Sequence, residues 1–231
     1  MDISTRARLP DSGAPKLLFL LFHGAGQSAS SMTALAQSLA VEYPQSAVLC
    51  VDAPNGSTPP SDGKFWFAGN GCSTATEAIP NFIAVVRELQ NRFNVGWEHT
   101  ALFGFAQGAT MALEAVQVEH SLAGRVLAFA GRHDSAPTYA PEDTTVHFLH
   151  GLQDSVVAHR AAVDSAQRLV ALGGDVTADV LPGIGHELHP ALIAKAIEQL
   201  RTFLPKKVWR EAAAQAPLIS RVASSDELGA D

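Results

Sequence analysis

Residues 101–108 read Ala-Leu-Phe-Gly-Phe-Ala-Gln-Gly, and this stretch decides the fold. Its first three residues, Ala101–Phe103, are apolar and suit a short strand that is buried on both faces. The next five residues, 104–108, place one glycine on each side of a three-residue centre. Glycine permits tight turns and close packing because it lacks a Cβ atom, so this pattern predicts a sharp strand-to-helix turn with Ala106 at its centre.

Short apolar stretches of the same kind recur along the chain and alternate with segments of helical period. Continuous apolar runs are typical of strands buried in a parallel sheet, and five are present: Leu17–Phe22, Ala47–Val51, Ala101–Phe103, Val126–Ala130 and Val146–Leu149. A sixth stretch, Val176–Leu181, alternates apolar and polar residues, which indicates a strand nearer the sheet edge.

In the segments between the strands, apolar residues recur at intervals of three and four residues, as in amphipathic helices. Three such helices are predicted, over Met32 to Tyr43, Ile79 to Phe93 and Leu192 to Phe203. Pro190 suits the first position of the last helix. Strand–helix alternation along the chain predicts an α/β fold with one mostly parallel, doubly wound sheet.

Composition agrees with a single domain and excludes several functions. The chain has 231 residues, of which 47% are hydrophobic and 17% charged. Its net charge of −7 argues against nucleic-acid binding. We find no signal peptide, and no apolar run approaches the roughly 20 residues of a membrane span. Two cysteines are too few for a disulfide framework. We therefore expect a cytoplasmic protein. We predict a domain over residues 1–210 and a flexible tail over 211–231; the oligomeric state stays open.

Four predicted strands are followed directly by glycine and by polar or titratable residues. Ligands of open parallel sheets bind beyond the carboxyl ends of the strands, so these segments are expected to share one rim. The segments are His23-Gly24-Ala25-Gly26-Gln27, Gly104-Phe105-Ala106-Gln107-Gly108, His150-Gly151-Leu152-Gln153-Asp154 and Pro182-Gly183-Ile184-Gly185-His186.

Asp154 and His186 follow the turn at Ala106 in the order nucleophile, acid, base, as in α/β-hydrolases. In such a site an imidazole removes the proton of a hydroxyl, while the carboxylate fixes the tautomer of the imidazole. The backbone N–H groups of Ala25 and Gln107 are candidates for the oxyanion hole. Alanine has no hydroxyl, however, so the sequence describes an acyl-transfer site without its nucleophile.

Together these motifs resemble the bacterial phospholipase/carboxylesterase family, related to acyl-protein thioesterases, whose turn reads Gly-Phe-Ser-Gln-Gly. The resemblance spans residues 16–210. It implies a compact α/β-hydrolase with no large lid, and hydrolysis of small carboxylic, thio- or lysophospholipid esters. The implied mechanism is Ser–Asp–His, without metal or cofactor. By position, the nucleophile falls on Ala106, the acid on Asp154 and the base on His186.

Ala106 has two interpretations. In the first, the chain is an engineered inactive variant, because Asp154, His186 and the glycines would have drifted after an ancient loss. In the second, it is a naturally non-catalytic protein that binds an acyl ligand or a partner in the same cleft. Loss of the nucleophile costs subtilisin about 10⁶-fold in kcat, so the chain is expected to be inactive or nearly so. A dehalogenase or epoxide hydrolase needs aspartate at this position, and Ala106 gives that alternative no support.

One long segment, Pro54 to Ser73, has no helical or strand period, and a loop of this length is usually functional. Its aromatic residues Phe65, Trp66 and Phe67 either wall a substrate pocket or pin the loop to the core; both readings stay open. Cys72 in the same segment is expected to be a plain loop cysteine.

The remaining histidines and glycines favour structural roles. His23 and His150 stand beside glycines at strand ends, where we expect structural hydrogen bonds, and His189 is placed to start a helix. His186, Glu187 and His189 lack the spacing of a zinc motif. The Gly24-x-Gly26 loop and Asp52 make an incomplete dinucleotide fingerprint, and Asp154 taken alone could be a turn or helix-capping residue.

Overall fold

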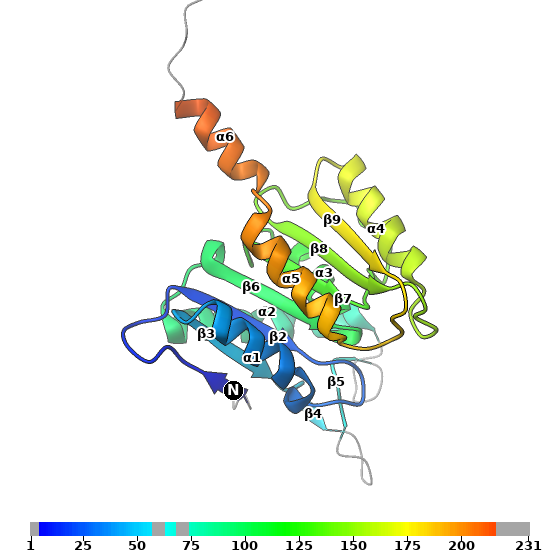
Figure 1. Ribbon diagram of the computed structural model, residues 1–231, viewed down its shortest axis with the longest axis horizontal. Coiled ribbons are helices and arrows are strands. Elements are labelled where there is room, and N and C mark those ends of the chain that lie inside the picture. Colours follow the sequence, from blue (N-terminus) through cyan, green and yellow to red (C-terminus); the bar gives the residue numbers. More distant parts are fainter. Residues whose placement is uncertain (1–4, 57–62, 68–73, 216–231) are drawn as a thin grey trace, which may run out of the picture.

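The computed structural model describes residues 5–56, 63–67 and 74–215, and its centre is one sheet of seven strands (Figure 1). The strand order is β1-β3-β2-β6-β7-β8-β9. β1 runs antiparallel to β3, and all other neighbouring strands of this sheet are parallel. The bounds are β1 Thr5–Arg8, β2 Leu17–Phe22, β3 Ser46–Val51, β6 Thr100–Phe105, β7 Arg125–Phe129, β8 Thr145–Gly151 and β9 Asp175–Leu181. The predicted mostly parallel α/β sheet is therefore confirmed.

Helices cover both faces of this sheet. Two of them, α1 (Thr33–Glu42) and α5 (Pro190–Thr202), lie in front of it in Figure 1 and share one hydrophobic core. The other core contains α2 (Ala75–Phe93), α3 (Gln107–Val118) and α4 (His159–Ala171). In β2, Leu18, Leu20 and Phe22 face this second core, while Phe19 and Leu21 face the first. Burial on both faces explains why the strands read as continuous apolar runs.

Each predicted strand and helix is found, with bounds that differ by up to four residues, and β9 is an edge strand as its alternation indicated. The helix α4 was not predicted. Pro190 is the first residue of α5, also as predicted. The sequence did not reveal β1, because its residues Thr-Arg-Ala-Arg have no apolar face and pair with β3 through the backbone. Two short 3₁₀ turns, Ala29–Met32 and Trp97–His99, precede α1 and β6.

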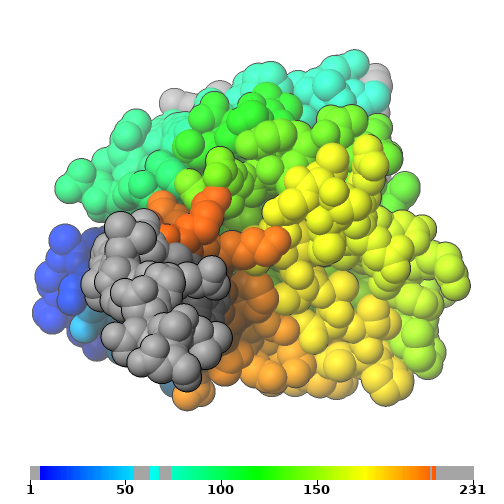
Figure 2. Space-filling view, turned by 90° about the horizontal axis from the view of Figure 1, so that it is seen from above, coloured from blue at the N-terminus to red at the C-terminus, as the bar shows by residue number. Residues whose placement is uncertain are grey.

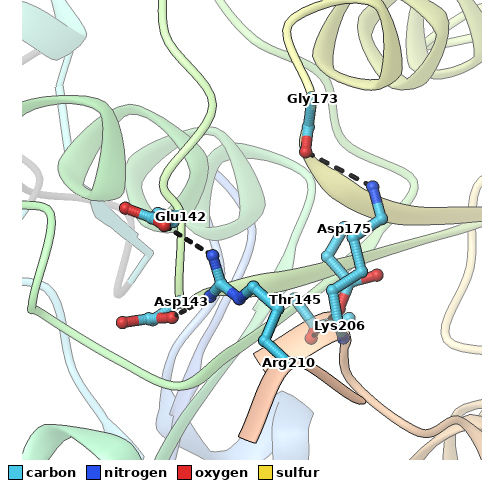
Figure 3. A network of polar contacts seen from close by, with 7 residues as sticks. All are labelled: Glu142, Asp143, Thr145, Gly173, Asp175, Lys206 and Arg210. Atoms are coloured by element: carbon cyan, nitrogen blue, oxygen red, sulfur yellow. Dashed lines mark hydrogen bonds and ion pairs between the residues drawn. The ribbon is translucent and has the colours of Figure 1, made fainter. Parts of the chain in front are cut away.

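A helix that the sequence did not predict, α6 (Lys206–Gln215), crosses the boundary expected at residue 210. Its first residue is anchored at the start of β9: the Lys206 N–H donates to Asp175 Oδ2 (2.9 Å), and Lys206 Nζ donates to Gly174 O (2.8 Å). One turn further, Arg210 forms ion pairs with Glu142 and Asp143 (Figure 3). Residues 211–215 are thus helical, whereas residues 216–231 of the expected tail lie outside the described part of the chain.

Figure 2 views the molecule from the end that carries α6 and shows the orange residues of this helix among green and yellow residues of the domain.

Among the helices of the described residues, none is long and apolar enough to cross a membrane.

The described part of the long segment 54–73 contains two short strands, β4 (Asn55–Gly56) and β5 (Lys64–Phe65), which pair antiparallel. Asp52 holds β5 in place, because its carboxylate pairs with Lys64 Nζ (2.9 Å) and also accepts the N–H of Ala29 (2.7 Å). The aspartate that could have suggested a dinucleotide site therefore has a structural role. Residues 57–62 and 68–73, with Cys72 among them, lie outside the described residues.

Candidate active site

The strand register brings the segments that carry the motifs to one edge of the sheet. Phe22 lies opposite Gly104, Phe105 opposite Phe129, and Gly151 opposite Leu181, so the strands end nearly level. Beyond their carboxyl ends lies a cleft of about 460 Å³. Its walls are formed by Gly24, Ala25, Gln27, Phe67, Phe105, Ala106, Gln107, Thr110, Arg132, Asp134, Val156, Val157 and His186. Segments from all four predicted motifs meet at this edge.

Ala106 occupies a sharp turn between β6 and α3. Its φ of +48° and ψ of −109° lie in a region that residues with a Cβ rarely adopt. The surrounding structure holds this conformation: a Cβ on Gly104 would lie 2.3 Å from Ala109, and one on Gly108 would lie 2.3 Å from the Phe22 carbonyl oxygen. Both flanking glycines are therefore required for the close approach of α3 to the sheet, as the sequence predicted.

Asp154 and His186 form a hydrogen-bonded pair beside this turn. His186 Nδ1 lies 2.8 Å from Asp154 Oδ2, and because an ionised carboxylate accepts hydrogen bonds, Nδ1 carries the proton. A neutral His186 then has an unprotonated Nε2, which has no hydrogen-bond partner among the described residues. His186 lines the cleft together with Ala106. The pair thus has the tautomer that a general base needs.

Asp154 is buried, yet it keeps its charge. Burial disfavours the carboxylate, but hydrogen bonds outweigh this effect and hold the pKa of Asp154 below its ordinary value. The donors are His186 and the backbone N–H groups of Val156 (2.9 Å) and Val157 (2.8 Å), both of which reach Oδ1. The turn after β8 therefore fixes the orientation of the carboxylate toward His186.

The two predicted oxyanion-hole residues, Ala25 and Gln107, both line the cleft. Gln107 is the first residue of α3, so its N–H has no partner within the helix. Neither this N–H nor that of Ala25 donates to another described residue. The turn that carries Ala25 is closed by the Gln27 side chain, whose Oε1 accepts the N–H of Gly24 (3.0 Å). Two residues that line the same cleft as Ala106 thus have backbone N–H groups without a partner among the described residues.

The three aromatic residues of the long segment separate into different environments. Trp66 is buried in the core beside Phe22, and its indole N–H donates to the His23 carbonyl oxygen (2.8 Å). Phe67 lines the cleft, whereas the half-buried Phe65 does not belong to its walls. The two open readings therefore apply to different residues: Trp66 pins the segment, and Phe67 faces the cleft.

The side chain of Gln107 connects this aromatic segment to the turn, a role that the sequence did not reveal. Its Oε1 accepts the backbone N–H of Trp66 (2.7 Å), and its Nε2 donates to the Phe67 carbonyl oxygen (2.8 Å). Gln107 thus lines the cleft and also holds the adjoining segment through its side-chain amide. The one sequence feature that could have indicated this role is the glutamine next to the central residue of the turn.

Two of the histidines expected to be structural are confirmed as such. His23 Nδ1 donates to the Gly24 carbonyl oxygen (2.7 Å), and its Nε2 accepts the Ala53 N–H (3.0 Å). His189 Nδ1 accepts the Ala191 N–H at the start of α5 (3.1 Å). His150 also makes a structural hydrogen bond, because its Nε2 donates to the Val157 carbonyl oxygen (2.8 Å). That same Nε2 lies 3.1 Å from Asp154 Oδ2, a contact that the sequence did not predict.

Two further buried histidines lie outside the predicted site. His133 follows β7, and neither of its ring nitrogens has a hydrogen-bond partner among the described residues. Burial lowers the pKa of His133 to about 4. His147 on β8 contacts Thr177 and Arg125, and burial, together with the Arg125 charge, lowers its pKa to about 3. Both imidazoles are therefore neutral at pH 7.

The described residues offer neither a metal site nor a reactive thiol. Within the described ranges, no cluster of three or more histidine, cysteine, aspartate or glutamate side chains could hold a metal ion. Cys50 is buried in the core, and burial raises the pKa of its thiol to about 11. That thiol stays protonated near neutral pH and is a poor nucleophile.

A strained strand-to-helix turn, followed along the chain by a hydrogen-bonded Asp–His pair at the carboxyl edge of a parallel sheet, defines an α/β-hydrolase. The chain belongs to the phospholipase/carboxylesterase family, whose model matches residues 10–204. It is 38% identical over 209 residues to esterase YpfH of Escherichia coli, covering 88% of this chain and 89% of that protein.

Two further relatives agree with this assignment. Acyl-protein thioesterase 1 of Gibberella zeae is 32% identical over 118 residues, which cover 48% of this chain and 50% of that protein. The crystal structure of esterase PE8 superimposes with a TM-score of 0.78 at 26% identity, covering 88% of this chain and all (100%) of that one. Family and relatives indicate a carboxylic ester hydrolase of the esterase or thioesterase type.

Proposed function

We propose that the cleft binds a small carboxylic, thio- or lysophospholipid ester and that Ala106 stands at the position of a catalytic serine in a Ser–Asp–His mechanism. The observation that carries this proposal is the 2.8 Å hydrogen bond between His186 and Asp154 in the cleft that Ala106 lines. This pair has the tautomer that removes a proton from a hydroxyl, and the strained turn is the conformation that exposes a nucleophile.

With serine at position 106, each remaining group has a defined task. The serine Oγ attacks the ester carbonyl carbon while His186 Nε2 takes its proton, and Asp154 stabilises the resulting imidazolium. The backbone N–H groups of Ala25 and Gln107 stabilise the negative oxygen of the tetrahedral intermediate. His186 then gives its proton to the departing alcohol or thiol, and water hydrolyses the acyl-enzyme by the reverse sequence.

With alanine at position 106, the chain lacks the atom that forms the acyl-enzyme. The hydrogen bond between Asp154 and His186 is present without the nucleophile, which supports removal of the nucleophile from an otherwise intact site, as in an engineered inactive variant. The second candidate, a naturally non-catalytic protein that binds an acyl ligand or a partner, is favoured by Ala106 itself. Either way, little or no hydrolysis is expected from the chain as it stands.

The walls of the cleft support a small substrate. Phe67, Phe105, Val156 and Val157 supply apolar surface for an acyl or alcohol group. A volume of about 460 Å³ lies in the lower half of the range found for small-molecule sites.

The test compares hydrolysis of p-nitrophenyl acetate and of an acetyl thioester by the chain and by its Ala106→Ser variant. We expect a gain of about 10⁴- to 10⁶-fold in kcat on introduction of serine. Adding Asp154→Asn to that variant is the matched control, and it is expected to remove about 10⁴-fold by favouring the wrong His186 tautomer. A folded Ala106→Ser variant that stays inactive on both esters would contradict the triad and favour the binding protein.

A further inference from the structure

His150 occupies an unexpected place next to the candidate triad. It is the second-last residue of β8, it is buried, and its Nε2 lies within hydrogen-bond distance of two oxygens, Val157 O (2.8 Å) and Asp154 Oδ2 (3.1 Å). A carbonyl oxygen accepts hydrogen bonds but cannot donate them, so Nε2 carries the proton. The Nε2–H of His150 therefore donates to the Val157 carbonyl oxygen, and Nε2 also lies close to Asp154 Oδ2.

This donor completes the surroundings of the Asp154 carboxylate. Oδ1 accepts two backbone N–H groups, from Val156 and Val157, Oδ2 accepts from His186 (2.8 Å), and His150 Nε2 lies 3.1 Å from the same Oδ2. A carboxylate offers about four lone-pair sites, so Oδ2 has room for a polar contact with His150 beside its hydrogen bond to His186. Because Oδ2 is the atom that holds His186, the donor that shares this oxygen acts directly on the Asp154–His186 hydrogen bond.

We propose that His150 is a positioning residue of the active site, which holds Asp154 Oδ2 in line with His186 Nδ1 and thereby keeps the base in its working orientation. This inference rests on the proposed function, in which Asp154 and His186 are the acid and the base. His150 does not line the cleft and touches no reacting atom; it acts through Asp154.

The alternative role for a buried imidazole is to fill space at the end of β8. The two roles differ in what they require of the side chain. Packing requires volume, which leucine supplies, whereas positioning requires a donor at the place of Nε2. Glutamine carries its amide nitrogen about as far from Cα as the histidine Nε2, while asparagine is one carbon shorter. His150→Gln should therefore preserve the positioning role, and His150→Leu and His150→Asn should abolish it.

The first measurement uses the chain with Ala106, so it does not depend on catalysis. A proton between His186 Nδ1 and Asp154 Oδ2 gives a low-field ¹H signal, which is assigned by its loss in His186→Gln. We expect this signal to persist in His150→Gln and to shift upfield or broaden beyond detection in His150→Leu and His150→Asn. An unchanged signal in a folded His150→Leu or His150→Asn protein would overturn the proposal.

The second measurement places the same substitutions in the Ala106→Ser variant. Loss of the polar contact with the Asp154 carboxylate predicts a fall in kcat of about 10- to 100-fold with little change in KM, and His150→Gln is expected to recover most of it. Equal losses in His150→Gln and His150→Leu would assign the residue to packing. If Ala106→Ser is itself inactive, the proposed function fails, but the low-field signal still decides whether His150 orients the Asp154–His186 pair.

Discussion

Lowering the pH from 7 to 5 is expected to destabilise the folded protein by about 2 kcal/mol through His133 alone. The His133 imidazole is 4% exposed, and neither ring nitrogen has a partner among the described residues. Its pKa in the folded state is about 4, against an ordinary value of 6.5 in the unfolded chain. At pH 5 the buried ring therefore stays largely neutral, whereas the same imidazole in the unfolded chain is largely protonated.

The direction follows from the order of the two values. Above pH 6.5 the imidazole is neutral in both states, so the full stability is present. As the pH falls below 6.5, the unfolded state binds a proton first, and stability is lost progressively until the folded state is protonated near pH 4. His147, with a pKa of about 3, contributes a second loss of similar size over the same interval. Together they amount to roughly 4 kcal/mol, a large part of an ordinary domain's stability.

The assay is urea unfolding followed by tryptophan fluorescence at pH 7 and pH 5. His133→Leu keeps the volume of the side chain and removes the titrating group, so the loss of unfolding free energy between the two pH values should shrink by about 2 kcal/mol. His120→Gln, which removes an exposed imidazole, is the control and should behave like the parent. An equally large loss in His133→Leu and in the parent would refute this account of His133.

Three further predictions concern the turn and the last helix. Gly108→Ala places a Cβ 2.3 Å from the Phe22 carbonyl oxygen, so it should lower stability by about 3 kcal/mol, seen as a fall in Tm. Gln107→Ala removes the two hydrogen bonds that hold residues 66–67 but keeps the backbone N–H; in the Ala106→Ser variant we expect KM to rise about 10-fold with a smaller change in kcat. Arg210→Ala removes the ion pairs of α6, so amide hydrogens in this helix should exchange faster while Tm changes little.

The central fold was predictable because burial leaves a direct trace in composition. β2 is buried on both faces and reads as an unbroken apolar run, which is typical of a strand inside a parallel sheet. The turn at Ala106 was also predictable, because the packing of α3 against β2 leaves no room for a Cβ at Gly108 and so requires a glycine there. β1 left no such trace, because a polar edge strand is held by backbone hydrogen bonds to β3 and not by side-chain burial.

The site was predictable to the level of residues but not of contacts. Asp154 and His186 follow strand ends, and the level register of the sheet brings them together. Trp66 packs in the core and Phe67 faces the cleft because the Gln107 side chain bonds to their backbone, and no local sequence pattern predicts these bonds. The approach of His150 to Asp154 depends on how the turn after β8 folds back on the strand, so it too required the structure.

The position of α6 has a practical consequence for attaching the protein to something else. This helix begins at the amino-terminal end of β9, whereas the cleft opens beyond the carboxyl ends of the strands. Figure 1 accordingly shows α6 at the opposite end of the domain from β4 and β5, which adjoin the cleft. A bead, a fused domain or an electrode linked through α6 would therefore sit at the amino-terminal ends of the strands, with the entrance of the cleft directed toward the free solution. The fold thus supplies a handle whose use leaves the route of small molecules to the cleft unobstructed.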